Sequence, residues 1–222
     1  MRRYSSTPTE RGFVADPTDA QRSADDRRTM ECDDRGIAVT LAEVALPLAW
    51  NLRGNASDAS FAAEARRSLG VPLPAEPLTS ERGGQGDTLL WLGPRSWLFV
   101  GASVSMRDDF DTARMAINAA RGALFDLSAS YVAWAISGVS APRVLNRLCP
   151  LDLHDKSFLP GRCAQSLLGH VNALVHRPNE SPTFIVMVAR SLAADAWHAL
   201  CTASASDGYR VEASRPFDSV AR

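Results

Sequence analysis

Residues 149–169, which read CPLDLHDKSFLPGRCAQSLLG, concentrate side chains that could do chemistry. Cys149, His154 and Cys163 are residue types that bind zinc. Zinc sites usually hold two ligands roughly two to four positions apart and repeat the pair. Here four and eight residues separate the three candidates, and no second pair occurs. The spacing therefore predicts no metal site.

A thiol paired with a histidine could also act as a nucleophile, but little in the sequence favours one here. A reactive cysteine needs an electropositive and partly exposed setting, and Cys163 beside Arg162 is the only candidate. No sequence feature directs any of the four histidines at a thiol. The one lysine, Lys156, lies in a polar segment, unlike the desolvated lysine that Schiff-base chemistry requires. We therefore predict no catalytic residue in this chain.

Motifs for cofactor binding are equally sparse. The glycines of GGQG at residues 83–86 do not have the G-x-G-x-x-G spacing of a dinucleotide site, and they precede a predicted strand. Asp126 could bind a pterin ring if the chain bound folate, although hydrogen bonding within the local turn that contains Ser128 is the commoner use of such a carboxylate. We predict no cofactor in this chain, and Asp126 is a candidate only under the folate alternative.

A different role suits the reactive segment better. It contains several directional side chains, and the residues from Phe158 to Gly161 predict a turn. Rigid irregular loops with an exposed phenylalanine and arginine are typical of protein recognition. We expect an interface-facing or fold-locking loop that uses Asp152, His154, Phe158, Arg162 and Gln165.

The flanking sequence predicts the elements that position this loop. Hydrophobic periodicity and capping residues predict helices at 57–70 (capped by Ser57 or Asp58), about 108–121, 140–149 (capped by Ser140) and 191–204 (capped by Ser191). Strands are expected at 37–54 (broken by Pro47), 88–101 (a hairpin), 123–138, 164–177 (with a bend at Gly169) and 183–190, the last covered on both faces. The order β-α-β-β-α occurs twice, which predicts an α+β fold of two packed modules, at about 37–122 and 123–210.

Composition sets outer limits on function. The 24 basic and 25 acidic residues nearly balance, so the chain lacks the positive excess that nucleic-acid binding requires. No apolar run approaches the ~18 residues of a membrane span, and the N-terminus shows no secretory signal, so we expect a cytoplasmic protein with reduced cysteines. Residues 1–36 are rich in charge and predict a disordered tail, unless Met30 is the true start.

Four strings carry a resemblance to a known family. LRG at 52–54, VPLP at 71–74, WLGPRSWL at 91–98 and the segment at 149–169 resemble the gamma subunit of heterotetrameric sarcosine oxidase, over residues from about 37 to 203. Two departures are visible. Arg95 and Ser96 stand where the family usually has acidic residues, and Val139-Ser140 replaces its usual Pro-Asp.

The resemblance implies a small, cofactor-free subunit of a bacterial complex. Its partners would be an alpha subunit with NAD and a folate-binding region, a beta subunit with FAD and covalent FMN, and a small delta subunit that is a candidate zinc carrier. The complex would oxidise sarcosine to glycine, reduce oxygen to hydrogen peroxide and pass the one-carbon unit to tetrahydrofolate. The implied fold is that of the folate-binding domains of aminomethyltransferases.

Two alternatives remain open at this point. The chain could be a folate-binding one-carbon protein of the aminomethyltransferase type that acts by itself, with Asp126 on the pterin. It could also be a thiol or zinc enzyme that uses Cys149, His154 and Cys163.

Overall fold

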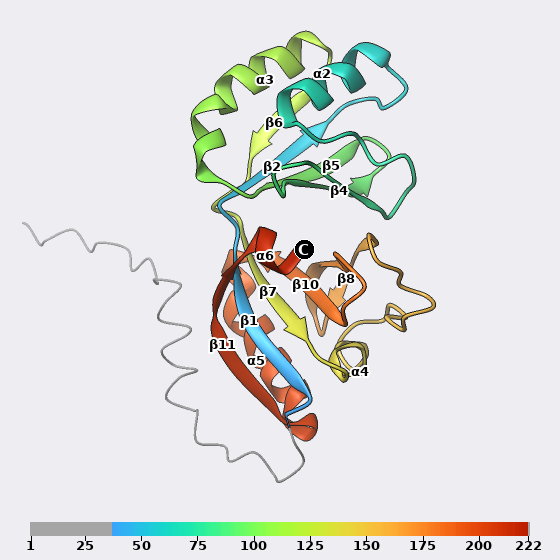
Figure 1. Ribbon diagram of the computed structural model, residues 1–222, viewed down its shortest axis with the longest axis vertical. Coiled ribbons are helices and arrows are strands. Elements are labelled where there is room, and N and C mark those ends of the chain that lie inside the picture. The colour runs from blue at the N-terminus through green and yellow to red at the C-terminus, as the bar shows by residue number, and fades with distance from the viewer. Residues whose placement is uncertain (1–36, 222) are drawn as a thin grey trace, which may run out of the picture. The chain divides into compact units, whose positions relative to one another are not determined.

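The computed structural model describes residues 37–221, which form an α+β fold built on two sheets (Figure 1). The tail that the sequence predicts at residues 1–36 and the alternative start at Met30 lie outside the described residues. No helix in the described range is long and apolar enough to cross a membrane.

The larger sheet has six strands in the order β11-β1-β7-β10-β9-β8. Its strands are β1 (Val39–Ala45), β7 (Tyr131–Ser137), β8 (Cys163–Leu168), β9 (Val171–His176), β10 (Thr183–Ala189) and β11 (Tyr209–Pro216). Neighbouring strands are antiparallel except β1 and β11, which are parallel. As predicted, β10 is central, and its residues are buried from Thr183 to Val188 because both faces of the strand are covered.

Two helices belong to the larger sheet, α4 (Ala141–Asn146) and α5 (Ala193–Ser204). Trp134 of β7 and Trp197 of α5 lie with their ring centroids 5.8 Å apart. Ser140 precedes α4 as expected, but its hydroxyl caps no backbone N–H, and a 3-10 turn at Arg190–Leu192 displaces the predicted cap at Ser191. The short helix α6 (Phe217–Ala221) follows β11.

The smaller sheet has five strands in the order β3-β4-β5-β2-β6. Its strands are β2 (Leu48–Arg53), β3 (Ser80–Arg82), β4 (Thr88–Gly93), β5 (Ser96–Gly101) and β6 (Ala123–Asp126). Helices α2 (Ala59–Leu69) and α3 (Phe110–Ala119), the latter preceded by a 3-10 turn at Val104–Asp109, pack on one face of this sheet. Asp58 caps α2 by accepting from the Ser60 N–H, and Gly70 ends it with φ +69°, as the sequence predicts.

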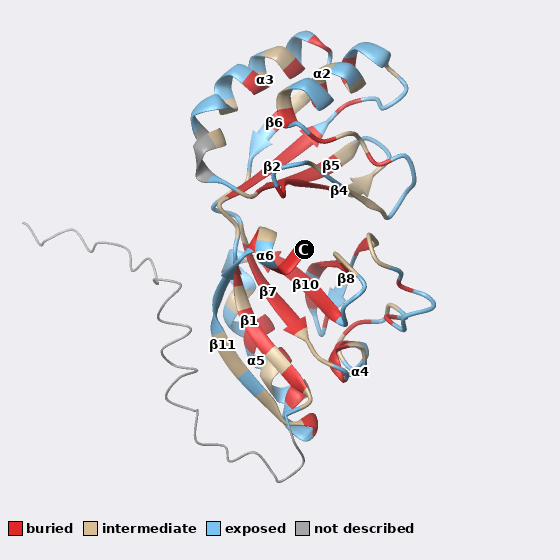
Figure 2. Ribbon diagram, viewed as in Figure 1, coloured by how far each residue is buried: buried red, intermediate tan, exposed pale blue. Residues whose placement is uncertain are grey.

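One hydrophobic core lies between the smaller sheet and helices α2 and α3. A second core lies between the two sheets, on the opposite face of the smaller sheet. It joins apolar side chains of both sheets and of α6, among them Ala49, Leu90, Leu98, Val100, Ala133, Ile185, Met187, Phe217 and Val220. The red ribbon segments of Figure 2 follow these buried strands. This core makes the two sheets one folded body from β1 to α6.

The division between the sheets does not fall at one point of the sequence, whereas the two expected modules meet at residues 122–123. Strand β1 lies in the larger sheet although it falls in the first expected module. Strand β6 lies in the smaller sheet although it falls in the second. The predicted strand at 123–138 is two strands, because the chain turns at Leu127–Ser130 and passes from one sheet to the other.

Four further features differ from expectation. The predicted strand at 164–177 is a hairpin of β8 and β9, because Gly169 adopts φ +63° at the turn where Leu168 and Val171 pair. Strands β3 and β11 and helix α6 carried no clear periodic signal and were not predicted.

Candidate functional site

The irregular segment at residues 149–162, called the connector here, leads from α4 to β8. Its exposed polar side chains bond within its own turn. The Asp152 carboxylate accepts from the His154 N–H at 3.1 Å and from the Ser157 hydroxyl at 2.5 Å. The Ser157 hydrogen bond and then the His154 N–H hold the pKa of Asp152 below its usual range. His154 Nδ1 in turn accepts from the Lys156 N–H at 3.3 Å. These bonds shape the loop.

Phe158 is buried, so the expectation of an exposed aromatic anchor on the connector is wrong. Its ring lies 6.3 Å from that of Phe184 on the central strand β10. The aromatic ring therefore fixes the connector to the larger sheet and presents nothing to a partner.

Arg177 is the residue of this region that the sequence did not reveal. It is 3% exposed, although arginine is rarely buried unless paired. Its guanidinium donates to the carbonyl oxygens of Phe158 at 2.8 Å and Glu180 at 3.4 Å, and forms an ion pair with Asp155 at 3.0 Å. It also lies 5.8 Å from the centre of the Phe184 ring. No sequence signal marks it, because its burial depends on a loop that folds over it from a distant position.

Two residues predicted for this loop, Arg162 and Gln165, donate to backbone carbonyls in the smaller sheet or just before its strand β3. Arg162 is half-buried and donates to the Pro77 carbonyl at 3.4 Å, while Gln165 is exposed and donates to the Leu92 carbonyl at 2.7 Å. The backbone continues this junction, since the Ser80 N–H donates to the Gly161 carbonyl at 2.8 Å. These contacts favour the fold-locking interpretation of the segment.

Cys163 is fully buried, and burial raises the pKa of its thiol to about 12. Its Sγ donates to the Thr79 carbonyl at 3.2 Å. Cys149 is also buried, whereas His154 is exposed. The structure therefore does not bring these three sequence candidates together, and no group of three metal-ligating side chains gathers among residues 37–221.

A serine and a histidine do meet beneath the connector. Ser80 Oγ lies 3.0 Å from His176 Nε2 and 3.0 Å from the Gly161 carbonyl oxygen. Because a carbonyl only accepts, the Ser80 hydroxyl gives its proton to Gly161, so His176 Nε2 must carry a hydrogen and donate. In that tautomer the imidazole does not take a proton from Ser80, so the pair is no activated nucleophile.

His176 is held neutral in this position. It is buried, its ring centroid lies 6.5 Å from that of Phe217, and its Nδ1 has no hydrogen-bond partner among the residues that the structure describes. Burial, and secondarily the charge of Arg82, lowers its pKa to about 3. Arg82 in turn donates to the Ala221 carbonyl at 2.5 Å, so the C-terminal helix α6 closes over the same junction.

Asp126 lies exposed at the end of β6 and is engaged locally. Its Oδ1 accepts from the Ser128 N–H at 2.9 Å and from the Ser128 hydroxyl at 2.5 Å. This is the turn geometry that the sequence suggested as the commoner use of the carboxylate.

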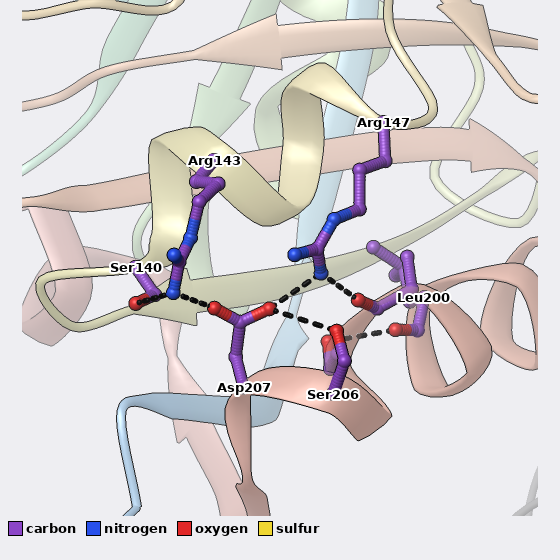
Figure 3. A network of polar contacts seen from close by, with 8 residues as sticks. Ser140, Arg143, Arg147, Leu200, Ser206 and Asp207 are labelled. Carbon is purple, nitrogen blue, oxygen red and sulfur yellow. Dashed lines mark hydrogen bonds and ion pairs between the residues drawn. The ribbon is translucent and has the colours of Figure 1, made fainter.

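A cluster of charged side chains ties α4 to the 3-10 turn at Ala205–Asp207 that follows α5 (Figure 3). The Asp207 carboxylate is 1% exposed and accepts from Arg147 at 2.5 Å and from Arg143. Burial alone would raise the pKa of Asp207, but the Arg147 hydrogen bond and the charges of both arginines lower it. These ion pairs hold α4 against the turn that follows α5.

The fold is similar to that of an aminomethyltransferase. Over 81% of this chain and 48% of the other, it is similar to the aminomethyltransferase T of the glycine cleavage system from Bartonella henselae, with a TM-score of 0.57 and 14% sequence identity. This likeness shows the fold alone.

The chain belongs to the sarcosine oxidase gamma subunit family, whose model matches residues 53–206. It is 31% identical over 149 residues to a sarcosine oxidase subunit gamma from Arthrobacter sp., covering 67% of this chain and 72% of that relative. It is 34% identical over 143 residues to the one from Corynebacterium sp. strain U-96, covering 64% and 68%. A chain of the heterotetrameric sarcosine oxidase from Corynebacterium sp. U-96 in complex with pyrrole 2-carboxylate is similar in structure, with a TM-score of 0.73, 28% identity and coverage of 85% of this chain and 94% of that one.

Proposed function

We propose that this chain is a non-catalytic accessory subunit of a heterotetrameric sarcosine oxidase. In this role it would assemble with alpha, beta and delta subunits in the bacterial cytoplasm. The whole complex would demethylate sarcosine to glycine, form hydrogen peroxide and transfer the one-carbon unit to tetrahydrofolate. NAD, FAD, FMN and the folate would be bound by the other subunits.

The state of the reactive side chains is the observation that carries the non-catalytic assignment. Cys163 is buried against a carbonyl with its pKa raised to about 12, and Ser80 gives its proton to the Gly161 carbonyl. A thiol with so high a pKa is not a thiolate at neutral pH, and thiolate is the nucleophilic form. The groups best suited to chemistry therefore serve to hold the connector.

Assembly supports the rest of the proposal. The similarity to a chain of a solved heterotetramer extends over 94% of that chain, so the two molecules correspond over almost a whole subunit. In addition, one face of the smaller sheet carries exposed side chains, Arg53 and Phe125, that a partner could cover.

The test is purification of the tagged full-length chain in two ways. Expressed alone, it should show no flavin absorbance and no sarcosine-dependent formation of hydrogen peroxide. Recovered from its native cell, it should bring with it flavin-containing chains and sarcosine oxidase activity. Sarcosine turnover by the chain alone, or its recovery without any oxidase subunit, would contradict the proposal.

A folate-binding protein that acts by itself is the alternative to be separated from this assignment. Titration of tetrahydrofolate into the chain expressed alone distinguishes the two. Saturable binding that is lost in Asp126→Asn would favour the alternative. Under our proposal neither the wild-type chain nor the variant binds, since Asp126 is occupied by its own turn.

A further inference from the structure

One face of the smaller sheet carries an arginine that the protein holds in position. Asn51 of β2 is 6% exposed, and its amide donates to the Ser96 hydroxyl and to the Trp97 carbonyl, each at 3.0 Å. Its Oδ1 accepts from Arg53 Nε at 2.9 Å. Arg53 itself is exposed. A buried and fully bonded amide therefore orients a guanidinium whose terminal nitrogens remain available.

An exposed aromatic ring lies on the same face. Phe125 of β6 is 50% exposed and pairs across the strands with Asn51. Side chains on one strand alternate between faces, so Asn51, Arg53 and Phe125 share the face opposite to helices α2 and α3. Strand β6 is also the outer strand of its sheet, and Figure 2 shows it largely exposed beside the buried β2.

The charge on this face is uncompensated. Arg95 is also exposed, but only its backbone is fixed next to this strand, since its carbonyl accepts from the Gly54 N–H at 3.2 Å. Within residues 37–221 neither Arg53 nor Arg95 forms an ion pair, whereas Arg121 nearby is paired with Asp58. An arginine without a carboxylate partner beside an exposed apolar ring suits a partner that supplies both a carboxylate and apolar surface.

We propose that the face formed by Arg53 and Phe125 docks a neighbouring protein subunit, through a carboxylate side chain flanked by an apolar one. The inference rests on the proposed function, since it names the surface by which the accessory subunit joins its complex. The terminal nitrogens of Arg53 donate to the carboxylate while Asn51 keeps Nε engaged. Phe125 packs against the apolar neighbour.

The chemistry of this face fits a protein and not a nucleic acid. Arginine and aromatic residues are enriched at the centres of protein interfaces, where they contribute most of the binding energy. Orientation by Asn51 before binding reduces the entropy that association would otherwise cost. Nucleic-acid binding requires many phosphate contacts, and a chain of net charge −1 with one arginine on this face does not supply them.

The experiment measures assembly with the chain replaced in its native cell by single variants. Complexes purified at high concentration are diluted, and the fraction still assembled gives the dissociation constant, with every subunit identified by mass spectrometry. We expect Arg53→Ala and Phe125→Ala each to raise the dissociation constant about tenfold or more, as interface anchors do. Arg53→Lys should weaken assembly less, because lysine keeps the positive charge but cannot bind both oxygens of a carboxylate as a guanidinium does.

Arg66→Ala is the matched control, because Arg66 is an exposed arginine on helix α2, away from this face. It should leave assembly unchanged. Thermal unfolding of each chain alone checks that these surface changes leave the fold intact. A photo-crosslinker placed at position 125 should capture an oxidase subunit next to an aspartate or glutamate.

Two results would overturn the inference, and they differ. If the complex assembles and Arg53→Ala and Phe125→Ala stay within about twofold of the wild type, the surface is wrong and the accessory role stands. If the wild-type chain joins no oxidase subunit at all, the proposed function fails and this inference fails with it.

Discussion

The connector and the Arg53 face differ in how their polar groups are satisfied. The connector carries a histidine, a cysteine, a lysine and aspartates that suggested chemistry, yet Asp152 and the His154 ring accept from backbone N–H groups of the same loop. Cys163, which follows the connector, donates to the Thr79 carbonyl. The Arg53 face has few reactive residue types, but it presents an arginine without a carboxylate partner in the described part of the chain. Residue types alone indicate which chemistry is available, whereas unsatisfied groups indicate where a second molecule binds.

The largest expected effect concerns the buried arginine that holds the connector. Arg177→Ala removes the donor to the Phe158 carbonyl in the buried junction, whereas the Glu180 carbonyl belongs to an exposed residue and can bond to water instead. We expect the free energy of unfolding to fall by about 3 kcal/mol, because a buried acceptor left unsatisfied is costly. Arg53→Ala, on the open face, should cost less, about 1 kcal/mol, because the Asn51 Oδ1 that loses its donor can then be reached by water.

Urea unfolding of the two variants measures this contrast. A loss of under about 1 kcal/mol in Arg177→Ala would mean that the connector is not locked, and the comparison between the two regions would no longer hold.

The second prediction is a pH dependence that the connector junction imposes. The pKa of His176 is lowered to about 3 in the folded chain, whereas in the unfolded chain it is about 6.5. Between these values the unfolded state binds more protons, so stability decreases as the pH falls, by up to about 1.4 kcal/mol per pH unit from this group. Above pH ~6.5 His176 contributes no slope, because it is neutral in both states.

Unfolding measured at several pH values between 4 and 7 tests this sign. The slope should be reduced in His176→Phe, which does not titrate, and retained in His154→Gln, since His154 is exposed. Equal slopes in His176→Phe and the wild type would show that the buried imidazole is not the source.

A third and smaller loss of stability is expected at Asp207, whose carboxylate is paired with two arginines. In Asp207→Asn the carboxylate between Arg143 and Arg147 is replaced by a neutral amide. We expect a loss of about 1–2 kcal/mol, because both arginines are partly exposed and water compensates them. Assembly should be unaffected, in contrast with Arg53→Ala. A thermal melt and the dilution measurement described above, made on the same variant, distinguish the two roles.

The smallest effect is expected in the chemical labelling of the Cys163 thiol. Because its pKa is raised to about 12 and its thiol is buried, iodoacetamide at pH 8 should leave it unmodified in the folded chain. Peptide mass spectrometry should find the modification only after unfolding in urea. Rapid labelling of the native chain at this position would reopen the thiol-enzyme alternative.

Parts of this fold could be predicted because their signals are local. Asp58, the apolar stripe of α2 and Gly70 lie within one stretch of chain, and each contributes through its neighbours at helical spacing. The continuous apolar run of β10 likewise required a covered central strand. The hairpin of β8 and β9 was missed, because a glycine in a strand-like run is read equally as a bend.

The candidate site could be predicted only in outline. The stretch before the predicted strand at 164 is irregular over residues 149–162, as expected, but its aromatic residue Phe158 is buried. Arg177 and the pair of Ser80 and His176 gave no signal, because their roles depend on residues about 20 to 100 positions away.

By itself the sequence determined the family, the α+β class, the near-zero charge and the helices whose caps and apolar stripes are local. Only the tertiary structure decided which strands share a sheet, which reactive groups are buried and which arginines remain unpaired. The physical reason is that burial and hydrogen-bond satisfaction are properties of residues that meet in space. A sequence pattern reports what lies a few positions away, whereas the state of a carboxylate, a thiol or a guanidinium is set by whatever the fold brings against it.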